Sequence, residues 1–139
     1  MRIKIALDQP IIFFVRVKGP KGTREFRAVF DTGSAYSLIP VQDARSLGYN
    51  AHFDPVSDIG TGTSIITKSD FVETDEIVLE EVSVADLTAK NVKAIAYNMP
   101  QIGGIEAVLG MTFISQFKTC MNIEQGYLTV ERIGNKPEA

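Results

Sequence analysis

The sequence predicts an all-β, barrel-like domain with one or two short helices. Three observations predict this fold class: many short runs of β-branched and aromatic residues, few segments with helical character, and turn-forming residues at close intervals. A chain of 139 residues is long enough for one domain with a substantial core. We expect that domain to span residues 1–133, and the polar segment 134–139 to be a flexible tail.

The N-terminal segments predict a short strand followed by a hairpin. Residues 3–7 alternate in polarity and suit an edge or intersubunit strand, and residues 11–17 form a β-branched and aromatic strand. The Gly-Pro-Lys-Gly turn at 19–22 returns the chain through a partner strand at 24–30. Valines alternate with cationic residues over positions 15–18, which indicates a strand with one buried face.

The rest of the chain predicts further strands and two short helices. Pro40 suits the first turn of a helix at residues 41–47, and Gly48 suits its left-handed end. A second helix is expected at residues 112–117. Strands are expected at 71–73, 76–79, 82–87 and 92–97, and a last hairpin at 120–123 and 127–131 turns about Glu124-Gln125-Gly126.

Charge limits the partners that the chain can take. A formal net charge of −3 argues against nucleic acid. The cationic residues are unevenly spread, however, because seven of the fourteen precede Asp31: Arg2, Lys4, Arg16, Lys18, Lys21, Arg24 and Arg27. This asymmetry either favours acidic substrates or marks the solvated face of the N-terminal hairpin.

The cysteine content and the N-terminus indicate a cellular compartment. Cys120 has no second cysteine to pair with and lies in a strand-like run, so we expect a buried thiol in a reducing environment. Charges interrupt the apolar residues of the N-terminal segment, which excludes a secretory signal or a membrane-spanning helix there. We expect a cytoplasmic protein with no membrane partner, or a soluble domain cut from a longer chain.

Asp31-Thr32-Gly33-Ser34 follows directly after an apolar strand and predicts a carboxylate held in a tight turn. Gly33 lets the backbone approach closely, and the hydroxyls of Thr32 and Ser34 can fix the loop and the carboxylate by hydrogen bonds. An ordinary strand ending in an Asx turn is the simpler explanation of the same residues.

Hydrolysis of a peptide by carboxylates alone needs two of them, one ionised to activate water and one protonated to bind the scissile carbonyl. Two carboxylates in contact share one proton, which separates their titrations. The chain has no second Asp-Thr-Gly triplet. The chemistry therefore predicts a homodimer in which Asp31 of each copy meets its counterpart on a two-fold axis.

Two segments together resemble the retropepsin-type aspartic proteases, and the cellular and bacterial members more than the viral ones. They are the Asp31 loop with Leu38-Ile39-Pro40, and the later Ala107–Ile114 segment. The resemblance implies a retropepsin-like closed β-barrel that acts as a homodimeric aspartic endopeptidase on peptide substrates, without a cofactor. Viral members commonly carry an Asp and an Arg where this chain has Ala35 and Met111, so their ion pair between the two segments is missing here.

The resemblance also implies a role for each candidate site residue. Asp31 is the catalytic residue, Thr32 hydrogen-bonds across the two-fold axis, and Ser34 supports the carboxylate from its outer side, with Gly33 completing the loop. The flap over the substrate is Gly60, Thr61, Gly62 and Thr63, unless these residues form an ordinary mobile loop. The substrate pocket is Ala35, Ile105, Glu106 and Val108, and Leu109 with Gly110 forms the structural motif behind the Asp loop.

Other interpretations of the sequence remain open. The Gly-x-Gly at 60–62 is not followed by a phosphate-loop pattern, and His52, the one histidine, has no partner at a metal-binding spacing, so no metal site is predicted. The chain could keep the fold as a catalytically silent dimerisation or peptide-binding module. It could also be an unrelated β-barrel binding protein.

Overall fold

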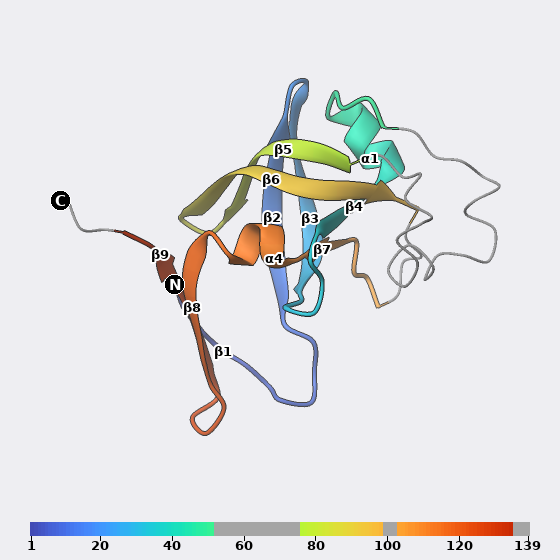
Figure 1. Ribbon diagram of the computed structural model, residues 1–139. Coiled ribbons are helices and arrows are strands. Elements are labelled where there is room, and N and C mark those ends of the chain that lie inside the picture. The colour runs from blue at the N-terminus through green and yellow to red at the C-terminus, as the bar shows by residue number, and fades with distance from the viewer. Residues whose placement is uncertain (52–75, 99–102, 135–139) are drawn as a thin grey trace.

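Six strands of the described residues close into a barrel in the computed structural model, which describes residues 1–51, 76–98 and 103–134 (Figure 1). Two short helices, α1 (Val41–Ser46) and α4 (Met111–Ile114), accompany the barrel, and none of the described helices is long and apolar enough to cross a membrane. The predicted all-β barrel with short helices is confirmed. The barrel strands are β2 (Ile12–Gly19), β3 (Gly22–Phe30), β4 (Ser37–Pro40), β5 (Glu76–Val84), β6 (Leu87–Tyr97) and β7 (Ala107–Leu109).

Parallel pairings bring distant segments together at one end of the barrel, whose strand order is β2-β3-β7-β4-β6-β5. β3 pairs in parallel with β7, so that Phe30 lies opposite Leu109. β4 pairs in parallel with β6 and touches the other side of β7 through Leu38 and Val108. Because β7 lies between β3 and β4, the loop that joins those two strands, residues 31–36, crosses the C-terminal end of β7.

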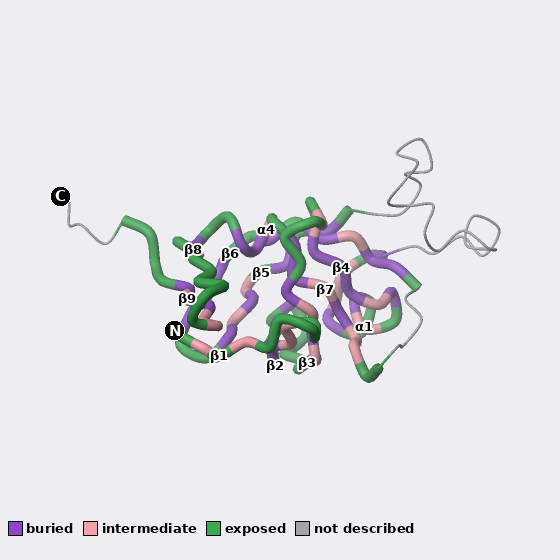
Figure 2. The backbone as a smooth tube through the Cα atoms, turned by 90° about the horizontal axis from the view of Figure 1, so that it is seen from below, coloured by how far each residue is buried: buried purple, intermediate pink, exposed green. Residues whose placement is uncertain are grey.

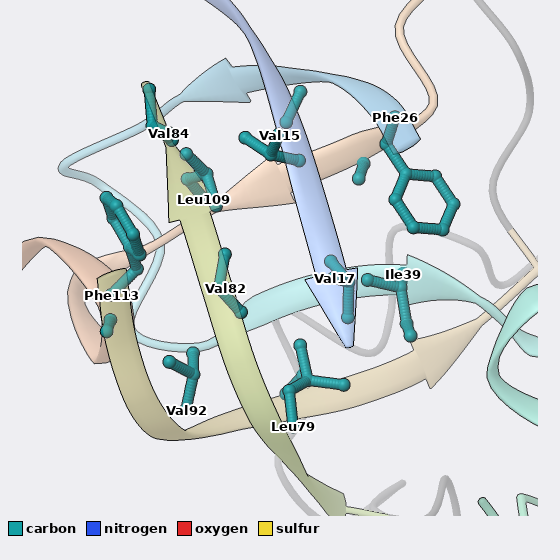
Figure 3. Packing of buried hydrophobic residues seen from close by; sticks show 14 of the residues in the cluster. Val15, Val17, Phe26, Ile39, Leu79, Val82, Val84, Val92, Leu109 and Phe113 are labelled. Carbon is teal, nitrogen blue, oxygen red and sulfur yellow. The ribbon is translucent and has the colours of Figure 1, made fainter. Parts of the chain in front are cut away.

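The hydrophobic core fills the barrel interior (Figure 3). Alternation along β2 directs Val15 and Val17 inward, each 2% exposed, while Phe14 and Arg16 face solvent, as the sequence predicts. Burying an aliphatic side chain of this kind contributes about 1.5–3 kcal/mol. Figure 2 shows buried and exposed residues alternating along the chain, with the buried ones gathered in the middle of the molecule. The largest fully buried side chains are Phe113, Leu79, Leu128, Val15, Val17, Val82, Val92 and Val130.

Tyr49 joins the end of α1 to the barrel wall. Its hydroxyl donates to the Lys18 carbonyl at 3.3 Å and accepts the Glu80 N–H at 2.8 Å, at the point where the β2–β5 ladder ends. Burial raises the pKa of the Tyr49 phenol above its ordinary value. Gly19 permits this approach, because a Cβ there would lie 2.8 Å from the Tyr49 ring.

A second sheet, which we call the terminal sheet, lies beside the barrel (Figure 1). Its strand order is β1 (Arg2–Lys4), β9 (Tyr127–Arg132) and β8 (Phe117–Asn122), all antiparallel. Leu128 and Val130 turn one face of this sheet into the barrel core. The sheet therefore joins the two ends of the described chain to the barrel and leaves β1 and β8 as free edges.

Three local predictions were wrong. The strands expected at 76–79 and 82–87 are one strand, β5, because Glu81 lies opposite Lys90 and the ladder continues through the acidic residues to Val84. The second helix ends at Ile114 instead of residue 117, because Phe117 already pairs in β8. Cys120 is exposed, not buried, because it lies on the outer face of the terminal sheet, which the single chain leaves uncovered.

Candidate active site

Asp31 lies directly after β3 and is exposed. Its backbone N–H donates to the Leu109 carbonyl at 3.0 Å, so the pairing of β3 with β7 extends into the aspartate itself. The Ser34 N–H donates to the Asp31 carbonyl at 3.2 Å and closes a tight turn. The carboxylate thus stands where a strand enters a turn, as the sequence predicts.

Gly33 orients the Asp31 carboxylate. The Gly33 N–H donates to Asp31 Oδ1 at 2.8 Å, and a Cβ at Gly33 would lie only 3.2 Å from the same oxygen. A glycine therefore lets the amide approach the carboxylate without crowding it. Within the described residues the second oxygen, Oδ2, has no hydrogen-bond partner, which leaves it open to a partner from outside the chain.

The two hydroxyls of the loop differ in what they bind. Ser34 was expected to support the active-site loop and the carboxylate from its outer side. Its Oγ donates to the Tyr36 carbonyl at 2.7 Å, a contact that stabilises the loop. The Asp31 carboxylate takes its hydrogen bond from the Gly33 backbone instead. Thr32 is exposed, and its hydroxyl has no hydrogen-bond partner within the described part of the chain.

Gly110 lets the end of β7 pass close behind the Asp31 loop. A Cβ at Gly110 would lie 2.6 Å from the Ser34 carbonyl oxygen and closer still to that of Tyr36. Beyond the glycine, the Met111 N–H donates to the Ser34 carbonyl at 2.7 Å and the Thr112 N–H donates to the Ala35 carbonyl at 3.2 Å. These backbone hydrogen bonds join the two segments that an ion pair joins in the viral enzymes.

Ser37 and Thr112 form a buried hydroxyl network that sequence reasoning missed. The Thr112 hydroxyl donates to the Lys93 carbonyl at 2.7 Å, so its oxygen accepts from the Ser37 N–H at 3.1 Å and from Ser37 Oγ at 3.0 Å. Ser37 Oγ in turn accepts the Gly110 N–H at 3.0 Å. Ser37 is 1% exposed, so the hydrogen bonds of its own N–H and hydroxyl replace lost contact with water.

This network ties β4, β6 and the start of α4 together behind the Asp31 loop. The one signal in the sequence was the position of the two residues, each a few residues beyond a predicted motif. Serine and threonine are common in loops, so that position alone did not distinguish them.

The residues predicted for the substrate pocket lie in different settings along β7 and the Asp31 loop. Val108 lies opposite Val29 on the outer face of the barrel, half-buried, and Ala35 is exposed. Ile105 is half-buried. The Glu106 carboxylate accepts the Arg27 backbone N–H at 2.8 Å, so one of its oxygens is already occupied. The predicted flap residues Gly60 to Thr63, His52 and residues 135–139 of the expected tail lie outside the described residues.

A cavity of about 450 Å³ lies on the terminal sheet and not at the Asp31 loop. The Arg2 guanidinium carbon lies 4.1 Å from the centroid of the Tyr127 ring at this cavity. In residues 1–51, 76–98 and 103–134 no three His, Cys, Asp or Glu side chains are placed to hold a metal ion. The cavity is lined by Arg2, Cys120, Met121, Asn122, Ile123, Tyr127 and Thr129.

Comparison with known proteins agrees with this geometry. A family model described as aspartyl protease matches residues 15–113. A crystal structure of a retropepsin-like aspartic protease from Rickettsia conorii is similar at 20% identity with a TM-score of 0.57, over 94% of this chain and 88% of that chain. The retroviral protease-like domain of Ddi1 from Leishmania major is similar at 12% identity with a TM-score of 0.47, over 90% and 92%. No curated protein matches this chain significantly.

Proposed function

Because the chain belongs to the aspartyl protease family and folds as a retropepsin-like barrel, we propose that it is an aspartic endopeptidase whose active site forms between two copies of the chain. The observation that carries the proposal is the position of Asp31. Its carboxylate is exposed at the end of β3, is oriented by the Gly33 N–H, and is backed by the Gly110 segment.

The proposed mechanism needs one Asp31 from each subunit. When the two carboxylates meet they share one proton, because two negative charges in contact repel each other. The ionised aspartate takes a proton from a water molecule, and that water attacks the scissile carbonyl. The protonated aspartate hydrogen-bonds the carbonyl oxygen and afterwards supplies the proton that the leaving amine needs. The free Asp31 Oδ2 is available for these contacts.

The proposed dimer has two contact regions. The exposed Thr32 hydroxyl is available to hydrogen-bond across the two-fold axis, next to the paired aspartates. The terminal sheet supplies the larger surface, because its edge strands β1 and β8 have unpaired backbone groups and its cavity adjoins exposed Met121 and Ile123. The exposed thiol of Cys120 on this sheet is consistent with a reducing, cytoplasmic location, which we include in the proposal.

The substitution Asp31→Asn tests the proposal. It keeps the size of the side chain and its acceptor for the Gly33 N–H, but it removes the shared proton and the base. We expect cleavage of a peptide library between about pH 4 and pH 7 to be lost by at least two orders of magnitude, while sedimentation still shows a dimer. Retained cleavage would overturn the proposal. A dimer that binds peptides but cleaves none at any of these pH values would instead identify a silent peptide-binding module.

Mixing the two proteins tests the shared site. If each active site takes one aspartate from each copy, an equal amount of the Asp31→Asn chain, allowed to exchange, reduces wild-type activity to about half, because random pairing makes mixed dimers. A site complete within one chain predicts no loss. The matched control is an equal amount of wild-type protein heated beyond recovery, which adds mass without exchangeable subunits.

A further inference from the structure

Arg27 places a guanidinium on the face of β3 that leads to the catalytic loop. Alternate residues of a strand share a face, so Arg27 and Val29 lie on the face that continues to Asp31, while Ala28 and Phe30 are buried in the core. Four residues of strand place the Arg27 Cα about 13 Å from that of Asp31. Val108, predicted to line the substrate pocket, lies opposite Val29 on β7.

Two neighbours hold the Arg27 side chain in place. Phe14, directly opposite across the hairpin, has its ring centroid 5.9 Å from the guanidinium carbon, although the residue is 73% exposed. Gly104 lies close to Nη1 of the same guanidinium. A Cβ at this glycine would lie only 2.7 Å from that nitrogen. Gly104 also has a φ of +76°, so a larger residue at that position is both strained and in the way.

The Arg27 guanidinium has no acceptor within the described part of the chain. Among the described residues it forms no ion pair and no hydrogen bond, and its Nε is buried without a partner. The two other arginines of the hairpin differ: Arg16 pairs with Glu25 at 3.9 Å, and Arg24 pairs with Asp43 at 2.7 Å. A planar, half-buried guanidinium with no acceptor among the described residues is suited to receive a carboxylate in a two-point hydrogen bond.

We infer, on the basis of the proposed function, that Arg27 makes the enzyme selective for peptides with an aspartate or glutamate side chain close to the scissile bond. A peptide whose scissile bond lies at Asp31 continues over Val29 and Val108 and then reaches Arg27. An extended peptide advances about 3.3 Å per residue, so the acidic residue lies within about four positions of the bond. Two-fold symmetry supplies one Arg27 on each side of it.

The experiment reads binding and cleavage separately. Binding of a randomised peptide library is measured on the Asp31→Asn dimer, which cannot consume the peptides, and each preferred acidic peptide is compared with its amide isostere. The same comparison is made after adding Arg27→Gln, Arg27→Glu or Arg27→Lys. Arg16→Gln is the matched control, because it removes the same charge from the same hairpin at a residue that already has an ion-pair partner. Circular dichroism checks that each variant is folded.

We expect the acidic peptide to bind on the order of tenfold more tightly than its amide at one position, as one charge-assisted hydrogen-bonded pair gives. Arg27→Gln removes this selectivity, Arg27→Glu reverses it toward lysine peptides, Arg27→Lys keeps part of it, and Arg16→Gln leaves it intact. Equal binding of acid and amide by the Asp31→Asn dimer overturns the inference, as does selectivity that survives Arg27→Gln. Acid selectivity without cleavage by the wild-type enzyme counts against the proposed function only.

Discussion

At the scale of the residue, the candidate site depends on groups that are small or that hydrogen-bond in more than one direction. Gly33 and Gly110 allow close approach, the first to a carboxylate and the second to the carbonyls of the loop. Ser37 and Thr112 connect the same loop to β6 through their hydroxyls. Changes of one methyl or one oxygen at these positions are therefore expected to alter the position of Asp31.

Gly110→Ala is expected to destabilise the fold by about 1–3 kcal/mol, because the added Cβ meets backbone carbonyls that cannot rotate away as a side chain would. Urea unfolding followed by circular dichroism measures this change. We also expect slower cleavage, since the displaced Ser34 carbonyl belongs to the turn that holds Asp31. An unfolding midpoint equal to that of the wild type would contradict the close approach described here.

Thr112→Val removes the hydroxyl without changing the shape of the side chain. The Lys93 carbonyl and the Ser37 donors lose their partner, and a loss of about 1–3 kcal/mol in unfolding free energy is expected. Thr112 acts here as a positioning residue, so we expect kcat to fall more than KM changes, and Thr112→Ser to restore most of it. A variant that loses stability but keeps its kcat would show that the network serves folding alone.

These residues also show what the sequence could and could not predict. Asp31, Gly33 and Gly110 belong to short motifs whose spacing is fixed along the chain, so they could be recognised from neighbouring residues. The Ser37–Thr112 contact joins positions 75 residues apart, and the hydroxyl of Ser34 had several acceptors within reach. Neither partner could be recognised from the motifs alone, because both depend on how the turn and the strands fold.

At the scale of the element, strands with one buried face were predictable and their ends were not. The alternation in β2 indicates its buried face directly. The end of α4 and the continuity of β5 depend on which strand lies alongside, since Phe117 and Glu81 are held by cross-strand partners. Cys120 shows the same limit, because a strand-like run does not tell whether another layer covers its outer face.

Tyr49 provides a prediction for the contact between α1 and the barrel. Its raised pKa means that the folded state retains the phenol proton more tightly than the unfolded chain does. The contribution of this phenol to the free energy of unfolding is complete below its unfolded pKa of about 10. It is lost as the pH rises through its higher pKa in the folded state. We expect the unfolding free energy to fall more steeply above pH 10 in the wild type than in Tyr49→Phe, which at neutral pH loses about 1 kcal/mol. Parallel curves in urea titrations from pH 8 to pH 11 would exclude this contribution.

At the scale of the whole molecule, each chain holds half of the proposed catalytic group. The barrel presents Asp31 at one place, and the terminal sheet leaves two edge strands and a cavity of about 450 Å³ uncovered at another. Association through these surfaces would supply both the second carboxylate and cover for the exposed apolar side chains. Activity per chain is accordingly expected to rise with protein concentration until dimers predominate.

Met121→Glu tests the surface of association. Met121 is 45% exposed on β8, and a charge there opposes a partner chain without disturbing the barrel core. We expect the dissociation constant of the Met121→Glu dimer to be roughly tenfold or more higher than that of the wild-type dimer. Val78→Glu is the control, since Val78 is 46% exposed on β5 of the barrel. Equal dissociation of both variants in sedimentation experiments would remove the terminal sheet from the proposed interface.

The pairing of β3 with β7 has a consequence for synthesis on the ribosome. Asp31 is translated early, but the segments that hold its loop, Leu109 and Gly110 with the first residues of α4, are translated some 80 codons later. A nascent chain consequently carries the aspartate for most of translation without the backbone contacts that aim it. The proposed dimeric site therefore cannot assemble until at least residue 110 has been translated.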